Sequence, residues 1–386
     1  MLPSIKKIAS ILVPLLLITN FAFCKPAPPT ISASGAVLID AKTGQILFEK
    51  NAYEQLPPAS TTKIMTAILA IESNRLEENA TISAKAANTS GSSMYLEKGQ
   101  IITLHELLTG LMLRSGNDSA IAIAEFISGS VDDFVVLMNE KAKELGAYHT
   151  HFQNPNGLPT PNHYSSAYDL AWITRYAMNN PIFAEIVNTK HTNVDWKDSR
   201  GNNHEQNLKN TNKLLWMLAE ADGVKTGTTN EAGPCLVASA TKNNQRLIAV
   251  MLHDKSRWQN SQNLLQWGFD NYELFEYANS GAFIDSVAVE GGFGESVDAI
   301  LGSDAAMVVE EAQKGSITVD IDIPDKIKAP VYQGQKIGEL KLLADNNVVK
   351  KVDLLAQSSI EEKTFVRIIF NKLTALFKLF SNWGIF

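Results

Sequence analysis

Ser60 stands three residues ahead of Lys63 in the stretch PASTTKIMTA. A serine hydroxyl is a poor nucleophile by itself, and a neighbouring lysine that has lost its proton can activate it as a base. The residues that follow have helical periodicity, so the two side chains share one helix face. The helix N-terminus favours negative charge near Ser60 and disfavours an ammonium at Lys63. Alternatively, Ser60 is a helix N-cap and Lys63 a solvated charge, and this stretch alone leaves both open.

The same spacing occurs twice more, and neither of those pairs suits catalysis. Ser4 and Lys7 lie in the expected export signal. Ser239 and Lys242 run off the end of a predicted strand, where residues i and i+3 face opposite sides. Only the pair at Ser60 is placed for serine chemistry.

Two triplets supply further polar groups. Ser115-Gly116-Asn117 falls on a short polar turn between predicted helices, and Lys225-Thr226-Gly227 ends a predicted strand. Each triplet also has a decoy, Ser261-Gln262-Asn263 in a helix and Lys42-Thr43-Gly44 in a hairpin turn. The order and local structure of the three motifs, more than any single match, indicate a common site.

In this order, S-T-T-K, S-G-N and K-T-G resemble the motifs of the penicillin-recognising serine enzymes. The longer text PASTTKIMTA, LMLRSGNDSAIAIAE, NGL…HYSSAYDLA and DGVKTGTTNEAG…LVASA is similar to the serine-type D-alanyl-D-alanine carboxypeptidases, the low-molecular-mass penicillin-binding proteins. The resemblance covers nearly the whole chain. It implies a hydrolase without cofactor or metal that removes the terminal D-alanine from peptidoglycan stem peptides and is acylated by β-lactam antibiotics.

The resemblance also implies roles for the residues of the first two motifs and for the lysine of the third. Ser60 would be the nucleophile that forms the acyl-enzyme, and Lys63 would be its base. Ser115 would relay a proton toward the leaving D-alanine, and Asn117 would hold the substrate amide. Lys225 would supply positive charge for the relay and for the terminal carboxylate.

The remaining implied roles concern substrate binding. The strand with Thr226 and Gly227 would pair with the extended peptide, and the backbone N–H groups of Ser60 and Thr228 would form the oxyanion hole. Many relatives have a histidine where this chain has Thr228, which leaves a backbone donor intact and can shift substrate preference. Arg257, in SRWQNSQNLLQWGF, would contact the carboxylate, and the alternative is a surface charge on a helix.

Two other functions compete with carboxypeptidase activity. Class A β-lactamases need the glutamate of an E-x-x-L-N motif to activate the deacylating water. No such motif lies between Asn117 and Lys225, since Glu185-Ile186-Val187-Asn188 has the wrong spacing, so β-lactams are predicted to acylate Ser60 and stay. A peptidoglycan-binding scaffold with an unused catalytic core is disfavoured because the motif residues are all intact.

The pattern of predicted strands and helices indicates an α/β (α+β) fold. The runs GAVLID, DGVKTGTT, CLVASAT and RLIAVML read as strands, and helical patterns lie between the first of them and the others. We therefore expect a penicillin-binding serine peptidase domain over residues 30–275, an antiparallel sheet flanked by a helical cluster. RWQNSQNLLQWGFDNYELF reads as a packing helix. Short strands over residues 278–358 predict a small all-β domain.

Residues 1–24 have the pattern of a signal peptide. Lys6 and Lys7 precede an apolar run at residues 8–18, and Ala22 and Cys24 are small residues at a cleavage position. A retained anchor is the alternative. Only Cys24 and Cys235 exist, so cleavage leaves one cysteine, and Cys235 is expected to be buried in a strand. His149, His151 and His163 are scattered over a loop, where we expect no metal site.

Residues 362–386 read as an amphipathic helix. A narrow polar stripe with Arg367 and Lys378, and with Lys372 beside it, interrupts an otherwise apolar and aromatic pattern, and every charge is basic beyond the first two residues. Such a helix suits a membrane interface, and the alternative is docking on the protein's own core. We expect an exported protein held peripherally at the periplasmic face of the cytoplasmic membrane. The net charge of −7 gives no support to nucleic-acid binding.

Overall fold

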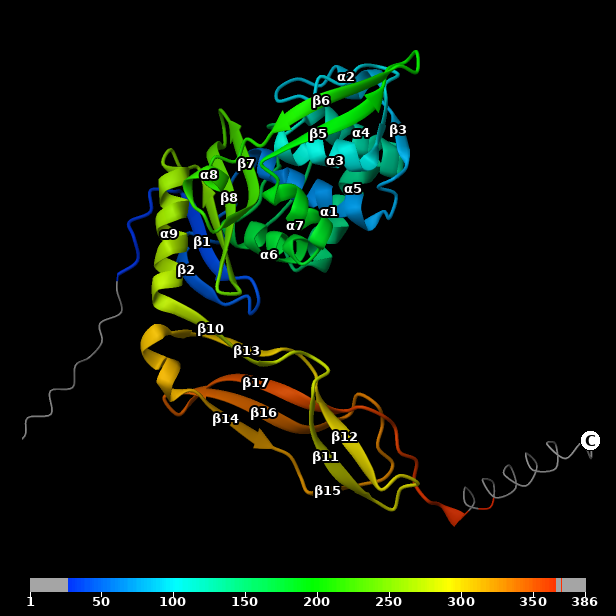
Figure 1. The fold of residues 1–386 in the computed structure, drawn as a ribbon, viewed down its shortest axis with the longest axis vertical. Helices are drawn as coiled ribbons and strands as arrows, with labels where there is room; N and C mark the ends of the chain where they lie inside the picture. Colours follow the sequence, from blue (N-terminus) through cyan, green and yellow to red (C-terminus); the bar gives the residue numbers. More distant parts are fainter. Residues whose placement is uncertain (1–26, 366–368, 370–386) are drawn as a thin grey trace, which may run out of the picture.

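The computed structural model describes residues 27–365 and residue 369 (Figure 1). The expected signal peptide lies outside the described residues, and so does most of the expected C-terminal helix. Within the described part of the chain, no helix is long and apolar enough to cross a membrane. The domain that contains the three motifs and an elongated β domain lie one above the other in Figure 1, and α9 and β10 connect them.

A five-stranded antiparallel sheet forms the centre of the upper domain, in the order β2-β1-β9-β8-β7. Its strands are β1 Gly35–Asp40, β2 Ile46–Lys50, β7 Ala221–Thr229, β8 Gly233–Lys242 and β9 Gln245–Leu252. The expected joining of strands from both ends of the domain is confirmed, because β1 pairs with β9. Alternate residues of β1 enter two cores, Val37 and Ile39 in one and Ala36 and Leu38 in the other, since helices cover both faces.

The helical cluster covers one face of this sheet, and α9 covers the other (Figure 1). The helices are α1 Lys63–Glu72, α2 Ala84–Ala87, α3 Leu104–Leu113, α4 Asn117–Ser128, α5 Val131–Glu144, α6 Ala167–Met178, α7 Pro181–Asn188, α8 Leu214–Met217 and α9 Arg257–Asn271. The start of α3 is fixed by a reciprocal capping box between Thr103 and Glu106. The helices that carry the motifs are therefore packed elements with defined ends.

A second sheet in the upper domain was not predicted from the sequence. Its order is β3-β4-β5-β6, with β3 Asn79–Thr81, β4 Ile101–Thr103, β5 His191–Lys197 and β6 Asn203–Lys209. The first two strands have three residues each, and the β5–β6 hairpin is mostly exposed and polar. Neither feature produces the apolar alternation that identifies a half-buried strand.

The lower domain is all-β, as expected. A six-stranded sheet has the order β14-β16-β17-β12-β11-β15, and β10 pairs with β13 beside it. The strands are β10 Tyr272–Ala278, β11 Phe283–Glu290, β12 Ser296–Leu301, β13 Ala305–Glu310, β14 Thr318–Asp322, β15 Lys326–Lys328, β16 Lys336–Ala344 and β17 Asn347–Ala356. The helix expected to continue through Phe275 ends at Asn271, because antiparallel pairing with β13 captures the chain from Tyr272 onward.

Candidate active site

Ser60 lies in a 3-10 turn, Ala59–Thr62, directly before α1. The turn is held by two side-chain bonds, from Thr61 Oγ1 to the Pro58 carbonyl (2.6 Å) and from Thr62 Oγ1 to the Ala59 carbonyl (2.9 Å). Thr62, and not Ser60, occupies the N-cap position of α1. Lys63 is completely buried. The alternative of a helix cap followed by a solvated lysine is therefore wrong.

The Lys63 amine is the centre of the polar cluster. Its Nζ lies 2.9 Å from Ser60 Oγ, 2.7 Å from Asn117 Oδ1 and 2.6 Å from the carbonyl oxygen of Asn156. Burial lowers the pKa of Lys63 well below its ordinary value, and the positive charge of Lys225 lowers it further. The nearby Asp118 carboxylate opposes this shift. The position thus favours a neutral amine within reach of the serine hydroxyl.

The S-G-N motif is positioned by the junction of two helices. Ser115 is buried on the turn between α3 and α4, with a left-handed backbone (φ 61°), and Asn117 is the first residue of α4. Thr211 connects this turn to the third motif. Its hydroxyl lies 3.2 Å from the Leu113 carbonyl and 3.3 Å from Thr226 Oγ1.

The K-T-G motif lies in β7, which passes directly beside the serine turn. A Cβ added to Gly227 would lie 2.8 Å from the backbone nitrogen of Ser60, so only glycine permits this approach. Lys225 is almost fully buried, and its Nζ donates to the Thr226 carbonyl at 3.0 Å. Burial lowers the pKa of Lys225 to about 7, with a further contribution from the positive charge of Arg257.

Arg257 begins α9 and is bonded to the K-T-G strand. Its Nη1 donates to the Gly227 carbonyl (2.6 Å), to Thr228 Oγ1 (2.8 Å) and to the Cys235 carbonyl (3.0 Å). Desolvation lowers the pKa of Arg257. The alternative of a surface charge on a helix is therefore wrong, because the Arg257 side chain joins β7 to β8 by hydrogen bonds beside the serine. Cys235 is fully buried, as expected.

The loop of residues 154–157 was missed as part of the site. The Asn156 carbonyl accepts from Lys63, and Thr66 of the same helix donates to the Pro155 carbonyl at 2.6 Å. Gly157 has a φ of +82°, and an added Cβ would lie 1.9 Å from the Ala59 carbonyl. The sequence NPNG predicts a turn, but a backbone carbonyl carries no residue-type signal for a role beside a lysine.

His163 contacts the serine turn through Thr62. Its Nδ1 accepts from the Gln153 N–H at 3.0 Å, and its Nε2 lies 2.9 Å from Thr62 Oγ1. Because the Thr62 hydroxyl donates to the Ala59 carbonyl, Nε2 must be the donor, which defines the neutral tautomer. Burial lowers the pKa of His163 to about 4, with a smaller effect from His151. This role of His163 was not predicted from the sequence, in which the histidine was weighed only for a metal site that was not expected.

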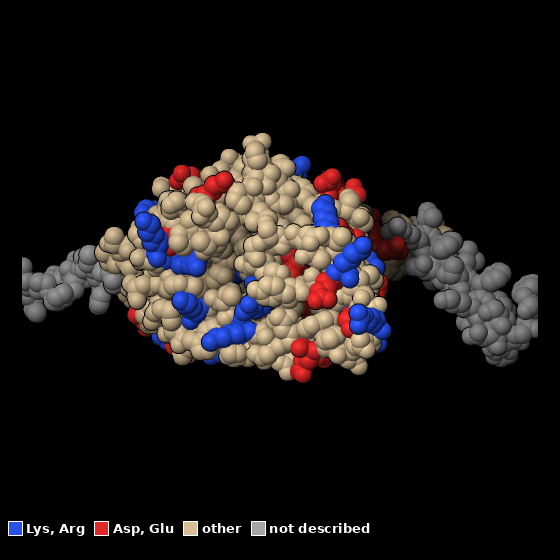
Figure 2. Space-filling model, turned by 90° about the horizontal axis from the view of Figure 1, so that it is seen from above, with Lys and Arg blue, Asp and Glu red and all other residues tan. Residues whose placement is uncertain are grey.

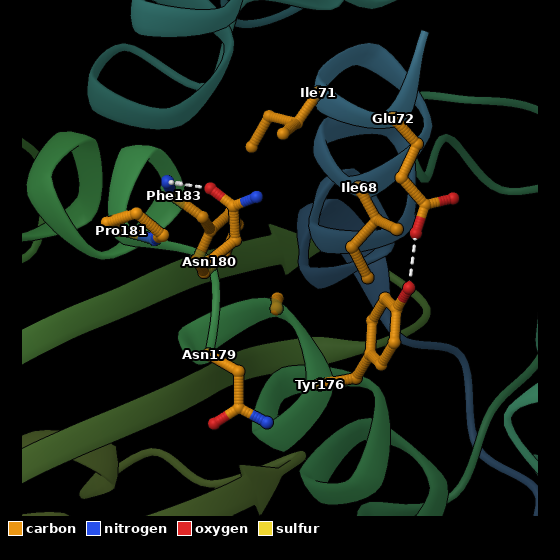
Figure 3. Close-up of a pocket in the computed structure, with 9 residues that line it drawn as sticks. Ile68, Ile71, Glu72, Tyr176, Asn179, Asn180, Pro181 and Phe183 are labelled. Carbon is orange, nitrogen blue, oxygen red and sulfur yellow. Dashed lines mark hydrogen bonds between the residues drawn. The ribbon is translucent and has the colours of Figure 1, made fainter. Parts of the chain in front are cut away.

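A cavity of about 300 Å³ lies at the other end of α1 (Figure 3). Ile68, Ile71 and Glu72 of α1 line it together with Tyr176, whose hydroxyl donates to Glu72. None of the motif residues reaches this cavity.

On the face of the molecule seen from above, Lys and Arg gather along one side, and basic and acidic residues alternate along the other (Figure 2).

Comparisons with known protein families match both domains of this chain. The family model for D-alanyl-D-alanine carboxypeptidases of the peptidase S11 family matches residues 23–256. The model for the C-terminal domain of penicillin-binding protein 5 matches residues 272–362. Both the peptidase domain and the β domain are thus of a known kind, and they occur here in one chain.

The relatives extend over nearly the whole chain. The D-alanyl-D-alanine carboxypeptidase DacF of Bacillus subtilis is 35% identical over 86% of this chain and 87% of its own. DacA of Escherichia coli is 33% identical over 93% and 90%. The crystal structure of penicillin-binding protein 5 from Haemophilus influenzae is 32% identical, with a TM-score of 0.77 over 87% of this chain and 99% of its own. The chain therefore belongs to the peptidase S11 family of D-alanyl-D-alanine carboxypeptidases.

Proposed function

We propose that this protein cleaves the bond between the two terminal D-alanines of peptidoglycan stem peptides, with Ser60 as nucleophile and Lys63 as general base. The observation that carries this assignment is the contact set of the Lys63 amine. Asn117 Oδ1 and the Asn156 carbonyl can only accept, so they take both hydrogens of a neutral amine. The nitrogen lone pair is then left for the proton of the Ser60 hydroxyl, 2.9 Å away.

The reaction proceeds in two steps. Ser60 Oγ forms a bond to the scissile carbonyl carbon while its proton passes to Lys63 Nζ. The carbon–nitrogen bond then breaks, and D-alanine leaves with a proton delivered through Ser115. Water attacks the ester in the second step, which releases the shortened peptide and restores the serine hydroxyl. Lys225, buried on the adjacent strand, supplies positive charge for the relay and for the substrate carboxylate.

Substrate binding is assigned to β7 and its neighbours. The strand edge at Thr226 and Gly227 pairs with the extended peptide, and Asn117 holds its amide. The backbone N–H groups of Ser60 and Thr228 form the oxyanion hole, an assignment supported by the close approach of Gly227 to the Ser60 nitrogen. Arg257, already bonded to Thr228 Oγ1, adds charge for the terminal carboxylate.

The same site accounts for β-lactam binding. A β-lactam presents a strained amide in place of the peptide bond, and Ser60 opens it to a covalent ester. The family match sets aside the β-lactamase alternative, and the chain lacks the E-x-x-L-N glutamate between Asn117 and Lys225. We therefore expect an acyl-enzyme that persists.

The location of the protein is proposed from the sequence pattern. Export follows from residues 1–24, and peripheral attachment to the membrane follows from the basic, amphipathic pattern of residues 362–386. Truncation after Glu362 is expected to release the protein from sedimented membranes into the soluble fraction. Continued sedimentation of the truncated protein would contradict the anchor.

The activity is tested by release of D-alanine from a pentapeptide that ends in D-Ala-D-Ala. We expect release by the wild type and none above background by Ser60→Ala or Lys63→Ala. A matched control is Lys242→Ala, which removes the lysine of the unused Ser239 pair. Release by Ser60→Ala at the wild-type rate would overturn the nucleophile assignment, and loss of activity in Lys242→Ala would show that the readout reports general damage.

A further inference from the structure

Asp118 follows Asn117 in the chain, and its side chain is completely buried. Its carboxylate accepts from Ser93 Oγ (2.6 Å), from the Met94 N–H (2.9 and 3.0 Å to the two oxygens) and from the Leu96 N–H (3.1 Å). It also accepts from the N–H of Ser119 at 2.9 Å. A carboxylate has acceptor sites on both oxygens for such a set, which an amide or hydroxyl lacks. The reaction steps proposed above do not use this group.

The segment that Asp118 holds, residues 90–96, is here called the clamp loop. This loop also bonds Asn117 directly. The Ser90 carbonyl accepts from Asn117 Nδ2 and the Ser92 carbonyl accepts from the Asn117 N–H, both at 2.7 Å. Because the Ser90 carbonyl can only accept, it directs the NH₂ of the amide toward the loop and leaves Oδ1 facing Lys63. The orientation of the Asn117 amide therefore depends on the position of the clamp loop.

The shape of the clamp loop is not one that its sequence adopts easily. Tyr95 has a left-handed backbone (φ 62°) and is 76% exposed, so its side chain gains little from packing. Such a conformation of a bulky residue is strained and persists only where surrounding contacts impose it. Met94 and Leu96, the residues on either side of Tyr95, are the two residues of the clamp loop whose N–H groups bond Asp118. The carboxylate thus holds the chain on both sides of Tyr95, whose own N–H donates to Ser93 Oγ at 2.7 Å.

We infer that Asp118 is a positioning residue for acylation, which holds the clamp loop so that the Asn117 amide presents Oδ1 to Lys63. This inference rests on the proposed roles of Asn117 and Lys63. Asp118 acts on the reacting groups through the loop and through its charge, and it does not itself touch the substrate. The charged groups that face Lys63 are Asp118 from α4 and Lys225 from β7.

The first test is Asp118→Asn, measured as the rate of Ser60 acylation by benzylpenicillin with intact-protein mass spectrometry. An asparagine at position 118 turns NH₂ donors toward the N–H donors of the clamp loop. We expect the rate to fall at least about tenfold, while the adduct still forms at Ser60. Acylation of the variant at the wild-type rate would overturn the inference. Absence of any adduct in the wild type would instead overturn the proposed function, so the two failures are distinguishable.

The pH dependence of the acylation rate tests whether Asp118 acts on Lys63 through its charge as well as through the clamp loop. The Asp118 carboxylate raises the pKa of Lys63 against the larger effects of burial and Lys225. Removing its charge therefore lowers that pKa, and the acidic limb of the acylation rate moves to lower pH in Asp118→Asn. An acidic limb that stays in place in Asp118→Asn would overturn the claim that Asp118 acts on Lys63 through its charge.

Two variants of the clamp loop test the same inference. They can refute it even if Asp118→Asn does not fold. Gly91 has a φ of +93°, and an added Cβ would lie 2.6 Å from Asn117 Nδ2. Gly91→Ala is expected to reproduce the rate loss by displacing the amide, with the acidic limb unchanged because the charge remains. Ser93→Ala removes one bond to Asp118 and should give a smaller loss. Wild-type rates in both loop variants would overturn the inference.

Discussion

Protonation of His163 is expected to loosen the turn that carries the nucleophile. In the folded protein Nδ1 accepts from the Gln153 N–H and Nε2 donates to Thr62 Oγ1. A proton added to Nδ1 would face another donor inside a buried site. The pKa of His163 is accordingly lowered to about 4 by burial and by His151. In the unfolded chain the same imidazole takes up its proton at the ordinary value of 6.5.

The sign and size of the effect follow from these two values. The unfolded state binds the proton as pH falls through 6.5, and the folded state binds it only near pH 4, so acid shifts the equilibrium toward unfolding. The stabilisation is fully present above pH 6.5 and is lost progressively down to pH 4. The difference corresponds to about 3 kcal/mol, a large share of the 5–15 kcal/mol that is typical for a folded domain.

Urea unfolding of the wild type and of His163→Gln, at intervals from pH 7.5 to pH 4, measures this loss. Glutamine supplies a donor and an acceptor without titrating, and the other histidines and carboxylates are common to both proteins. We expect the wild type to lose about 3 kcal/mol more than the variant between pH 7 and pH 4. Parallel curves for the two proteins would refute the structural origin that we assign to the lowered pKa.

Three further predictions concern the strand beside the serine. Gly227→Ala places a Cβ 2.8 Å from the Ser60 nitrogen, so acylation by benzylpenicillin should slow about a hundredfold, and a rate within twofold of the wild type would contradict the proposed approach of β7. Arg257→Gln should raise KM about tenfold more for a peptide with a free terminal carboxylate than for its amide analogue, whereas equal losses on both would argue against carboxylate binding. Burial raises the pKa of the Cys235 thiol to about 11, so a disulfide reagent at pH 8 should label it only after denaturation, and rapid labelling of the native protein would show that β8 is accessible.

The parts that were predictable from the sequence are those where residue type and spacing carry the information. Ser60, Lys63 and Asn117 were predicted to meet, and direct contacts join them. The strands β8 and β9 were predicted as well, because buried strands form largely continuous apolar runs. Local patterns are sufficient in these cases.

The parts that were missed depend on backbone groups and on tertiary pairing. The Asn156 carbonyl bonds Lys63, but any residue type could supply a carbonyl at that position. The role of His163 requires a partner 101 positions away, Thr62, which no local pattern reveals. Tyr272 continues a helical pattern and nevertheless begins a strand, because pairing with Glu310 and its neighbours outweighs local propensity.

The assignment of Ser60 as the nucleophile of a penicillin-binding carboxypeptidase can be checked by the intact mass of the protein after incubation with benzylpenicillin. We expect a covalent adduct with the mass of one opened β-lactam, persistent after removal of free drug and absent from Ser60→Ala. Consumption of the drug without an adduct would mean rapid deacylation and a β-lactamase. A folded wild-type protein that neither forms the adduct nor consumes the drug would contradict the assignment of Ser60 altogether.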